Sequence, residues 1–168
     1  EVDDIIGTLV QKYSATEKVM ILSSDKDFAQ LQRYPNVEQF SPILKKFVKE
    51  PFPLIQLKQL IIRGDKGDGI PNILSSDDVF VAGGRQKPIT ESKIIKWLNQ
   101  DPKEFCNDEM FRNYSRNEIM IDLTKVPDSL KQNILNTYEA AKGKTKQEFM
   151  NYTIANRLKN LLEVAHEF

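Results

Sequence analysis

Two aspartates that follow a short apolar run are the residues best suited to chemistry. Residues 19–22 are apolar, and two serines separate them from Asp25 and Asp27. This pattern predicts a buried parallel strand with carboxylates at its carboxyl end, the edge where open α/β sheets bind ligands. Two carboxylates this close repel each other unless a cation or basic partner lies nearby. Mg²⁺ and Mn²⁺ are oxygen-preferring ions that suit such a site.

A second acidic group opens the chain. Glu1, Asp3 and Asp4 stand at the start of an apolar repeat with helical spacing, which predicts a helix over residues 1–12. Acids in a first helical turn also complement the helix dipole. These three residues therefore have a structural explanation beside a functional one.

A third acidic group follows a strongly apolar helix predicted over residues 54–62. Asp65 and Asp68 stand in a segment with three glycines, which let the backbone turn tightly and approach a ligand. Aspartates three residues apart can face the same way on a helical turn. The alternative is a solvent-exposed turn, in which aspartate and glycine are common.

The combination of three acidic groups predicts a site for hard divalent cations. The chain has one histidine and one cysteine, so no cluster of these residues supports zinc. Carboxylates gathered around magnesium or manganese suit a two-metal site for phosphoryl transfer, where one metal activates water and the pair clamps the reacting oxygens.

The elements that position these acids predict an α/β protein. Strands are predicted over residues 19–22 and 37–40, followed by an edge hairpin over residues 43–48. From residue 90 the pattern is helical, with separate segments at 108–114 and 119–123 and a single last helix. Trp97 and Cys106 are predicted to pack as apolar core residues.

Composition limits the classes of function. The 24 basic and 24 acidic residues give zero formal charge, so any signal for nucleic-acid binding must be local. A single cysteine excludes an internal disulfide framework and suits a reducing compartment. No apolar run approaches the length of a membrane span.

The acidic motifs, in their order, resemble the 5′-nuclease family of flap endonucleases and 5′-to-3′ exonucleases. Within that family they are most similar to the T4-type bacteriophage ribonucleases H. The motifs are Glu1-Val2-Asp3-Asp4, Ser23-Ser24-Asp25-Lys26-Asp27-Phe28 and Gly64-Asp65-Lys66-Gly67-Asp68.

The resemblance implies how the chain is organised. Residues 1–64 would form the C-terminal half of a PIN/flap-endonuclease-like α/β core, with a mostly parallel sheet and flanking helices. Residues 65–168 would form a mainly helical, DNA-binding C-terminal domain. The N-terminal part of the nuclease domain, with a further aspartate, would be absent, so we expect this fragment by itself to have little or no activity.

The resemblance also implies an enzymatic role for the intact protein. It would hydrolyse phosphodiesters at 5′ ends of RNA–DNA hybrids, duplex DNA and flaps with Mg²⁺, or with Mn²⁺ as a substitute, and so remove RNA primers in phage DNA replication. The catalytic residues it implies are Asp25, Asp27 and Asp68. The metal ligands it implies are Glu1, Asp3, Asp4, Asp25, Asp27, Asp65 and Asp68.

Basic residues supply candidate contacts to nucleic acid. Arg85 and Lys87 lie in a glycine-containing loop, where they suit phosphate contacts or an ordinary solvated loop. Lys66 neighbours the third acidic group. Lys144 and Lys146 follow a predicted helix end, either as part of a phosphate-binding stripe or as a solvated face.

The alternative function is a non-catalytic module that binds DNA or a replication protein and inherits its acidic motifs from such a nuclease. Under either hypothesis we expect a monomer in the cytoplasm of an infected bacterial host, without membrane contact. A single-stranded-DNA-binding protein is a further expected partner.

Overall fold

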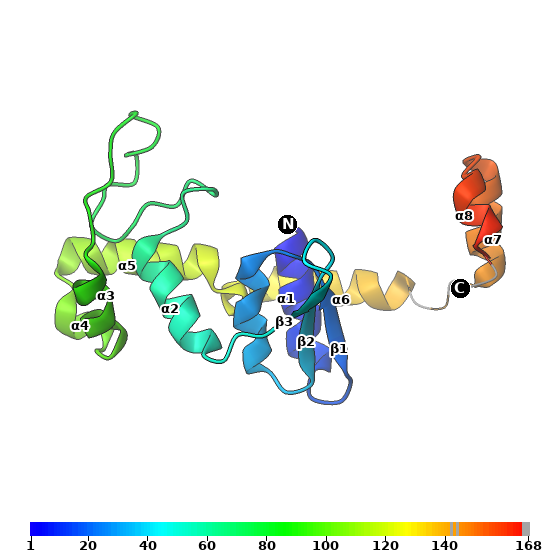
Figure 1. Cartoon of the computed structure of the whole chain (residues 1–168), viewed down its shortest axis with the longest axis horizontal. Helices are drawn as coiled ribbons and strands as arrows, with labels where there is room; N and C mark the ends of the chain where they lie inside the picture. Colours follow the sequence, from blue (N-terminus) through cyan, green and yellow to red (C-terminus); the bar gives the residue numbers. More distant parts are fainter. Residues whose placement is uncertain (142, 144, 166–168) are drawn as a thin grey trace. The chain divides into compact units, whose positions relative to one another are not determined.

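The computed structural model describes residues 1–141, 143 and 145–165. The first part of the chain contains helix α1 (Val2–Tyr13), strand β1 (Val19–Leu22), the 3₁₀-helix η1 (Lys26–Arg33), strands β2 (Val37–Ser41) and β3 (Lys46–Val48), and helix α2 (Pro53–Arg63). It is an α/β arrangement followed by a helical region, as predicted (Figure 1).

The sheet is small and mixed. Its strand order is β1-β2-β3, with β1 parallel to β2 and β2 antiparallel to β3. The expectation of a mostly parallel sheet is therefore met by the first pair only. The hairpin of β2 and β3 pairs Phe40 with Phe47, and their rings meet edge to face with centroids 5.2 Å apart.

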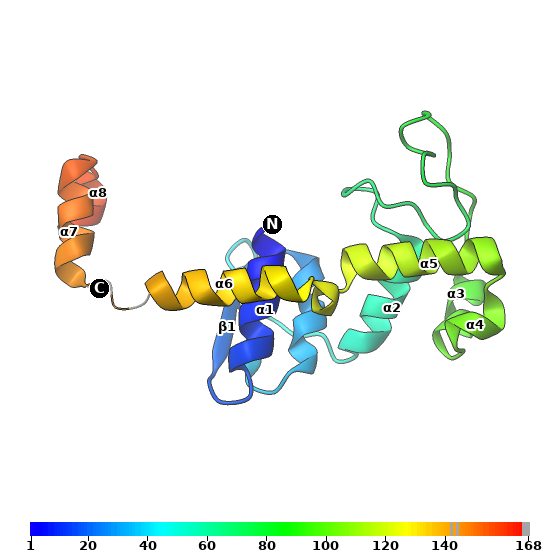
Figure 2. The ribbon, with the colours of Figure 1, turned by 180° about the vertical axis from the view of Figure 1, so that it is seen from behind.

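Strand β1 is covered on one face, contrary to the prediction of a buried strand. Ile21 is buried with Val10 of α1 and with Phe28 and Leu31 of η1. Helix α1 lies against this face of the sheet, as the two opposite views show (Figure 2). The alternate residues Met20 and Leu22 are 61% and 66% exposed, because no described element of the chain covers their face.

A second core holds the helical region together. After a long loop come α3 (Glu91–Leu98), α4 (Pro102–Phe105), α5 (Asp108–Ile121) and the 3₁₀-helix η2 (Leu123–Lys125). Trp97 stacks on Phe105 with ring centroids 5.1 Å apart, and both pack with Cys106 against α2 and α5. The predicted core role of Trp97 is confirmed at 9% exposure. The segments predicted at 108–114 and 119–123 instead form the continuous helix α5 and the start of η2.

Residues 1–131 form one compact unit and residues 132–168 form another. The domain boundary predicted after residue 64 lies inside the first unit, because α2 packs on both η1 and α5. Helix α6 (Asp128–Ala141) leads into the second unit, where α7 (Lys146–Ala155) packs on α8 (Lys159–Glu163) in place of the single predicted last helix. None of the described helices is long and apolar enough to cross a membrane.

Candidate metal centre and the loop beside it

Three aspartates from two distant segments converge. Asp27, Asp65 and Asp68 each offer a carboxylate oxygen, and these oxygens all lie within 4.8 Å of one another. Among the described residues this is the one group with the geometry for a metal ion. Asp27 lies in the first turn of η1, and the other two follow α2, so the packing of α2 on η1 brings them together.

The donor set fits a small, hard cation. Mg²⁺ binds oxygen at roughly 2.1 Å, so opposite ligands on one ion lie about 4.2 Å apart. The three carboxylate oxygens therefore need only a small adjustment to share an ion. A metal ion there would also offset the mutual repulsion of three acids.

Asp25 has a different local role from Asp27. Its Oδ1 accepts a hydrogen bond from the backbone N–H of Asp27 at 2.9 Å and so caps the first turn of η1. Asp25 is exposed and lies outside the group of three. The two carboxylates predicted to act together thus have different contacts. Asp25 caps η1, whereas Asp27 belongs to the group of three convergent acids.

A tight turn presents Asp65 and Asp68. The N–H of Ile70 donates to the carbonyl of Asp65 at 2.7 Å, which closes the turn as an isolated antiparallel bridge. The N–H of Gly67 donates to Asp65 Oδ1 at 2.8 Å and fixes that side chain. Gly64 enters the turn with φ +68° and ψ −179°, a conformation open essentially to glycine alone.

Lys26 is a site residue that the spacing of residues along the chain did not predict. Its Nζ lies 2.6 Å from Asp65 Oδ2, and this ion pair lowers the pKa of Asp65 and raises the pKa of Lys26. The only signal in the sequence is its place between two aspartates. The lysine balances part of the negative charge, while the other oxygen of Asp65 accepts from Gly67.

The acids at the start of α1 face the same hollow. A cavity of about 290 Å³ is lined by acids of all three sequence groups and by apolar side chains. Asp4 also accepts a hydrogen bond from the backbone nitrogen of Glu1, which completes a capping box. The acids that line the cavity are Glu1, Asp3, Asp4, Asp27 and Asp68.

Burial and repulsion favour protonation of two of these acids. Burial raises the pKa of Asp27 from 3.8 to about 6, Asp25 adds to the rise, and Lys26 opposes it. Burial also raises the pKa of Asp3, with smaller contributions from Asp25 and Glu1. The site therefore holds excess negative charge at neutral pH, which a bound cation would relieve.

The raised pKa of Asp27 predicts a pH dependence of metal affinity. Between about pH 4 and pH 6 the folded chain holds a proton on Asp27 that the unfolded chain has released, so this residue's contribution to stability falls as pH rises through 6. Metal binding requires the carboxylate, so Mn²⁺ affinity should rise from pH 5 to pH 7, by at most about tenfold per unit for one proton. Calorimetric titrations at pH 5, 6 and 7 measure this. An affinity independent of pH would contradict the proton linkage.

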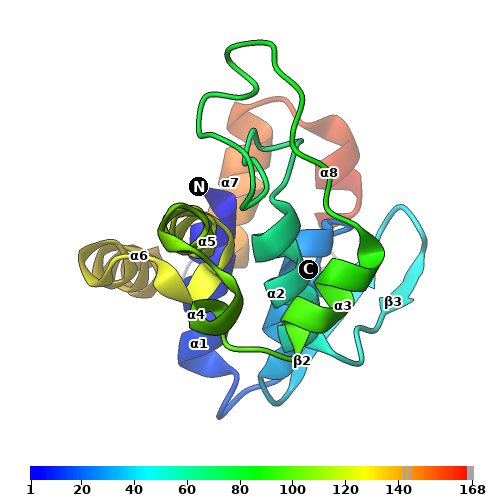
Figure 3. The ribbon, with the colours of Figure 1, turned by 90° about the vertical axis from the view of Figure 1, so that its left-hand side faces the viewer.

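The connection between α2 and α3 continues after the acidic turn as a long loop that projects away from the helices (Figure 3). Hydrogen bonds join the two ends of this loop at its base. Asn72 donates to the carbonyl of Lys87 at 2.8 Å and accepts from the N–H of Leu74 at 3.0 Å. The N–H of Asn72 donates to Gln86 Oε1, and the N–H of Lys87 donates to Ser75 Oγ at 2.9 Å. These bonds therefore close off residues 76–85 as a separate loop.

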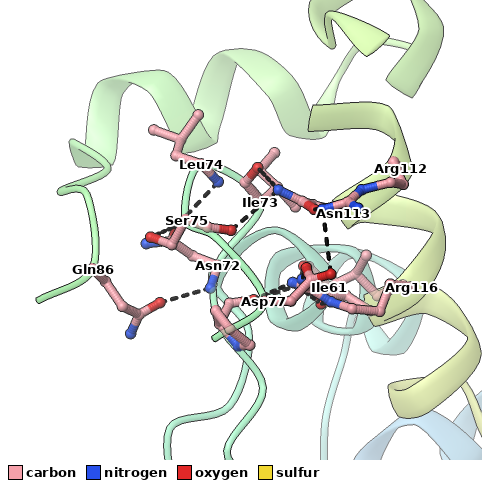
Figure 4. Close-up of polar contacts among 12 residues, drawn as sticks. Ile61, Asn72, Ile73, Leu74, Ser75, Asp77, Gln86, Arg112, Asn113 and Arg116 are labelled. Carbon is pink, nitrogen blue, oxygen red and sulfur yellow. Dashed lines mark hydrogen bonds and ion pairs between the residues drawn. The ribbon is translucent and has the colours of Figure 1, made fainter. Parts of the chain in front are cut away.

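Side chains of α5 join the base of this loop to the helical core. Asn113 is 1% exposed and donates to the carbonyls of Ile73 and Ser75, both at 3.1 Å. Arg116 pairs with Asp77, which also lies 3.3 Å from Arg112 (Figure 4). The buried side-chain amides of Asn72 and Asn113 therefore position the loop. In the sequence these asparagines look like ordinary surface residues, so their role could not be predicted.

The candidate nucleic-acid contacts belong to different parts of the chain. Arg85 is exposed on the loop of residues 76–85, Lys87 is exposed at the base of that loop, and Lys66 is exposed in the acidic turn. Lys146 is exposed at the start of α7, in the second unit. Lys144 lies outside the described residues.

Comparison with known proteins places the chain in a family. Residues 53–168 match the family described as T4 RNase H, C terminal. The whole chain aligns with a protein named Ribonuclease H from Enterobacteria phage T4, with 31% identity over 176 residues. The chain spans 58% of the length of that relative.

Proposed function

Because the chain belongs to the T4 RNase H family, we propose that it is part of a nuclease that hydrolyses phosphodiesters with divalent metal. The observation that carries this proposal is the convergence of Asp27, Asp65 and Asp68 within 4.8 Å. The finer proposal is a Mg²⁺-dependent 5′-to-3′ exonuclease and flap endonuclease built on a PIN-like core. Its substrates would be RNA–DNA hybrids and duplex or flap DNA, and its role the removal of RNA primers in phage replication.

The chain's residues take distinct parts in this proposal. Asp27, Asp65 and Asp68 would hold a magnesium ion, and the acids at the start of α1 would extend the site across the cavity for a second. Bound ions would supply Lewis acidity and a nucleophilic water at neutral pH. Lys26 would restrain Asp65, and Asp25 would set the start of η1 and so the direction of Asp27.

Metal binding and cleavage test the proposal separately. Calorimetry of the 168-residue chain with Mn²⁺ should give one or two sites. For cleavage, the chain should replace its counterpart in the phage T4 relative, and the chimera should cut a 5′-labelled RNA–DNA hybrid and a 5′-flap with Mg²⁺ but not with EDTA. A folded chimera that binds substrate without cutting it, together with no manganese binding by the chain, would favour the non-catalytic module.

Arg85 and Lys87 are predicted to contact phosphate. Replacing both by Ala should weaken duplex binding similarly for different sequences and reduce the slope of log K against log salt by about 0.9 per lost contact. Fluorescence anisotropy at several salt concentrations measures both effects. Lys18, exposed before β1 and so at the other end of that strand from the acids, supplies the control Lys18→Ala. Equal effects of the control and the double variant would refute the assignment.

The remaining assignments follow from the same proposal. The protein would act as a monomer in the cytoplasm of the infected host, and a single-stranded-DNA-binding protein would be a further partner.

A further inference from the structure

A buried glutamine stands directly behind the acidic strand end. Gln39 lies in the middle strand β2 opposite Ile21 and is 2% exposed. Its Nε2 donates to the carbonyl of Ser23 at 3.0 Å and to the carbonyl of Asp25 at 2.7 Å. One side-chain amide therefore serves two backbone carbonyls of the segment that carries Asp25 and Asp27.

A second glutamine fixes how this amide is turned. Gln32 of η1 donates from its Nε2 to Gln39 Oε1 at 3.1 Å. The Oε1 of Gln32 accepts from the backbone N–H of Glu50 at 2.8 Å. Only one orientation of each amide satisfies the backbone groups at the two ends of this pair. These groups are the N–H of Glu50 at one end and the carbonyls of Ser23 and Asp25 at the other.

The hydrogen bonds from Gln39 hold the backbone of residues 23–25, and the conformation of this segment determines the direction of the Asp25 and Asp27 side chains. The carbonyl of Asp25 belongs to the residue that caps η1, and Asp27 stands in the first turn of that helix. Outward-facing bonds in the same segment join Asp25 N–H to Ser23 Oγ at 3.1 Å and Asp27 N–H to Asp25 Oδ1 at 2.9 Å. Those bonds are local and solvent-exposed, whereas Gln39 links the segment to the interior of the sheet.

We propose that Gln39, held by Gln32, is a positioning residue that sets the geometry of the acidic segment 23–27 for metal binding. This inference rests on the proposed function, since it concerns the same metal centre. Gln39 would touch neither metal nor substrate. Outer residues that orient ligands typically affect metal affinity roughly 10- to 100-fold.

A matched pair of variants tests the role. Gln39→Met keeps an unbranched side chain of similar length but removes both donors. Gln30→Met is the control, because Gln30 is 0% exposed and also bonds two backbone groups, the carbonyl of Ile121 and the N–H of Leu123, which are not part of the acidic segment. Both variants lose buried hydrogen bonds, so both are expected to be less stable than the wild type. Thermal unfolding followed by circular dichroism identifies a temperature at which both variants are folded, and the measurements are made there.

The expected results separate positioning from a general loss of stability. Mn²⁺ affinity by calorimetry should fall roughly 10- to 100-fold in Gln39→Met and change less than about twofold in Gln30→Met. In the metal-free chain, amide hydrogen exchange over residues 23–27 should accelerate in Gln39→Met only. Gln39→Glu, which places a carboxylate against the two carbonyls, should lose at least as much affinity.

Two outcomes would overturn the inference. The first is manganese affinity in folded Gln39→Met equal to that of the wild type. The second is equal acceleration of exchange over residues 23–27 in the Gln39 and Gln30 variants. If the wild-type chain binds no manganese, that result counts against the proposed function, and the exchange measurement still decides whether Gln39 holds the segment.

Discussion

Replacing Asp27 by Asn is expected to remove metal binding while leaving the metal-free chain at least as stable at pH 7. Asp27 is half-buried, and it is the one of the three convergent acids that η1 contributes, whereas Asp65 and Asp68 follow α2. Changes in outer residues already lower metal affinity up to about 100-fold, so loss of this ligand should cost more than roughly 100-fold. Cleavage by the T4 chimera should disappear with it.

The Asp27→Asn variant should lose metal binding and yet be no less stable than the wild type. At pH 7 Asp27 is ionised in an environment that raises its pKa, so the neutral amide removes a charge that burial and Asp25 disfavour. Thermal denaturation without metal should show an unchanged or higher Tm, and the stabilisation by Mn²⁺ should be lost. Asp78→Asn, at an exposed loop position, is the control for the charge change. Undiminished manganese binding by Asp27→Asn would remove Asp27 from the site.

Gly64→Ala is expected to have the largest effect on the fold around the site. A Cβ at this position would lie 2.3 Å from the carbonyl oxygen of Ile70 and 2.5 Å from the carbonyl carbon of Pro71. The backbone conformation at φ +68° and ψ −179° is itself unfavourable for alanine. Strain and overpacking together should lower the free energy of unfolding by about 3 kcal/mol or more.

The same substitution should also move the acidic turn. Backbone atoms must separate to admit the methyl group, and they belong to the bridge that presents Asp65 and Asp68. Gly69→Ala is the matched control, since Gly69 also has positive φ, at +74°, but no atom lies within 4 Å of its added Cβ. It should cost about 1–2 kcal/mol. Chemical denaturation and manganese titration of both variants measure the difference, and equal losses would show that the close contact at Gly64 is unimportant.

Much of the local structure follows from neighbouring residues. The strand before Asp25 and the helix before Gly64 were both predicted, because apolar spacing and glycine act within a few residues. The acids could be recognised as functional candidates for the same reason. Each stands at the start or the end of an apolar element, where a carboxylate can be placed without entering a hydrophobic core.

The pairing of those acids depends on packing between elements far apart in the chain. Local spacing suggested that Asp25 and Asp27 act together, whereas the packing of α2 on η1 places Asp27 with Asp65 and Asp68. The contact of Lys26 with Asp65 joins residues 39 positions apart, and the bonds from Gln39 reach back 14 and 16 positions. Local sequence determined the strand and the helices beside the acids and which carboxylates stand at their ends. Only the tertiary structure decided which carboxylates meet and which buried amides hold them, because those distances are set by side-chain packing across the core rather than by spacing along the chain.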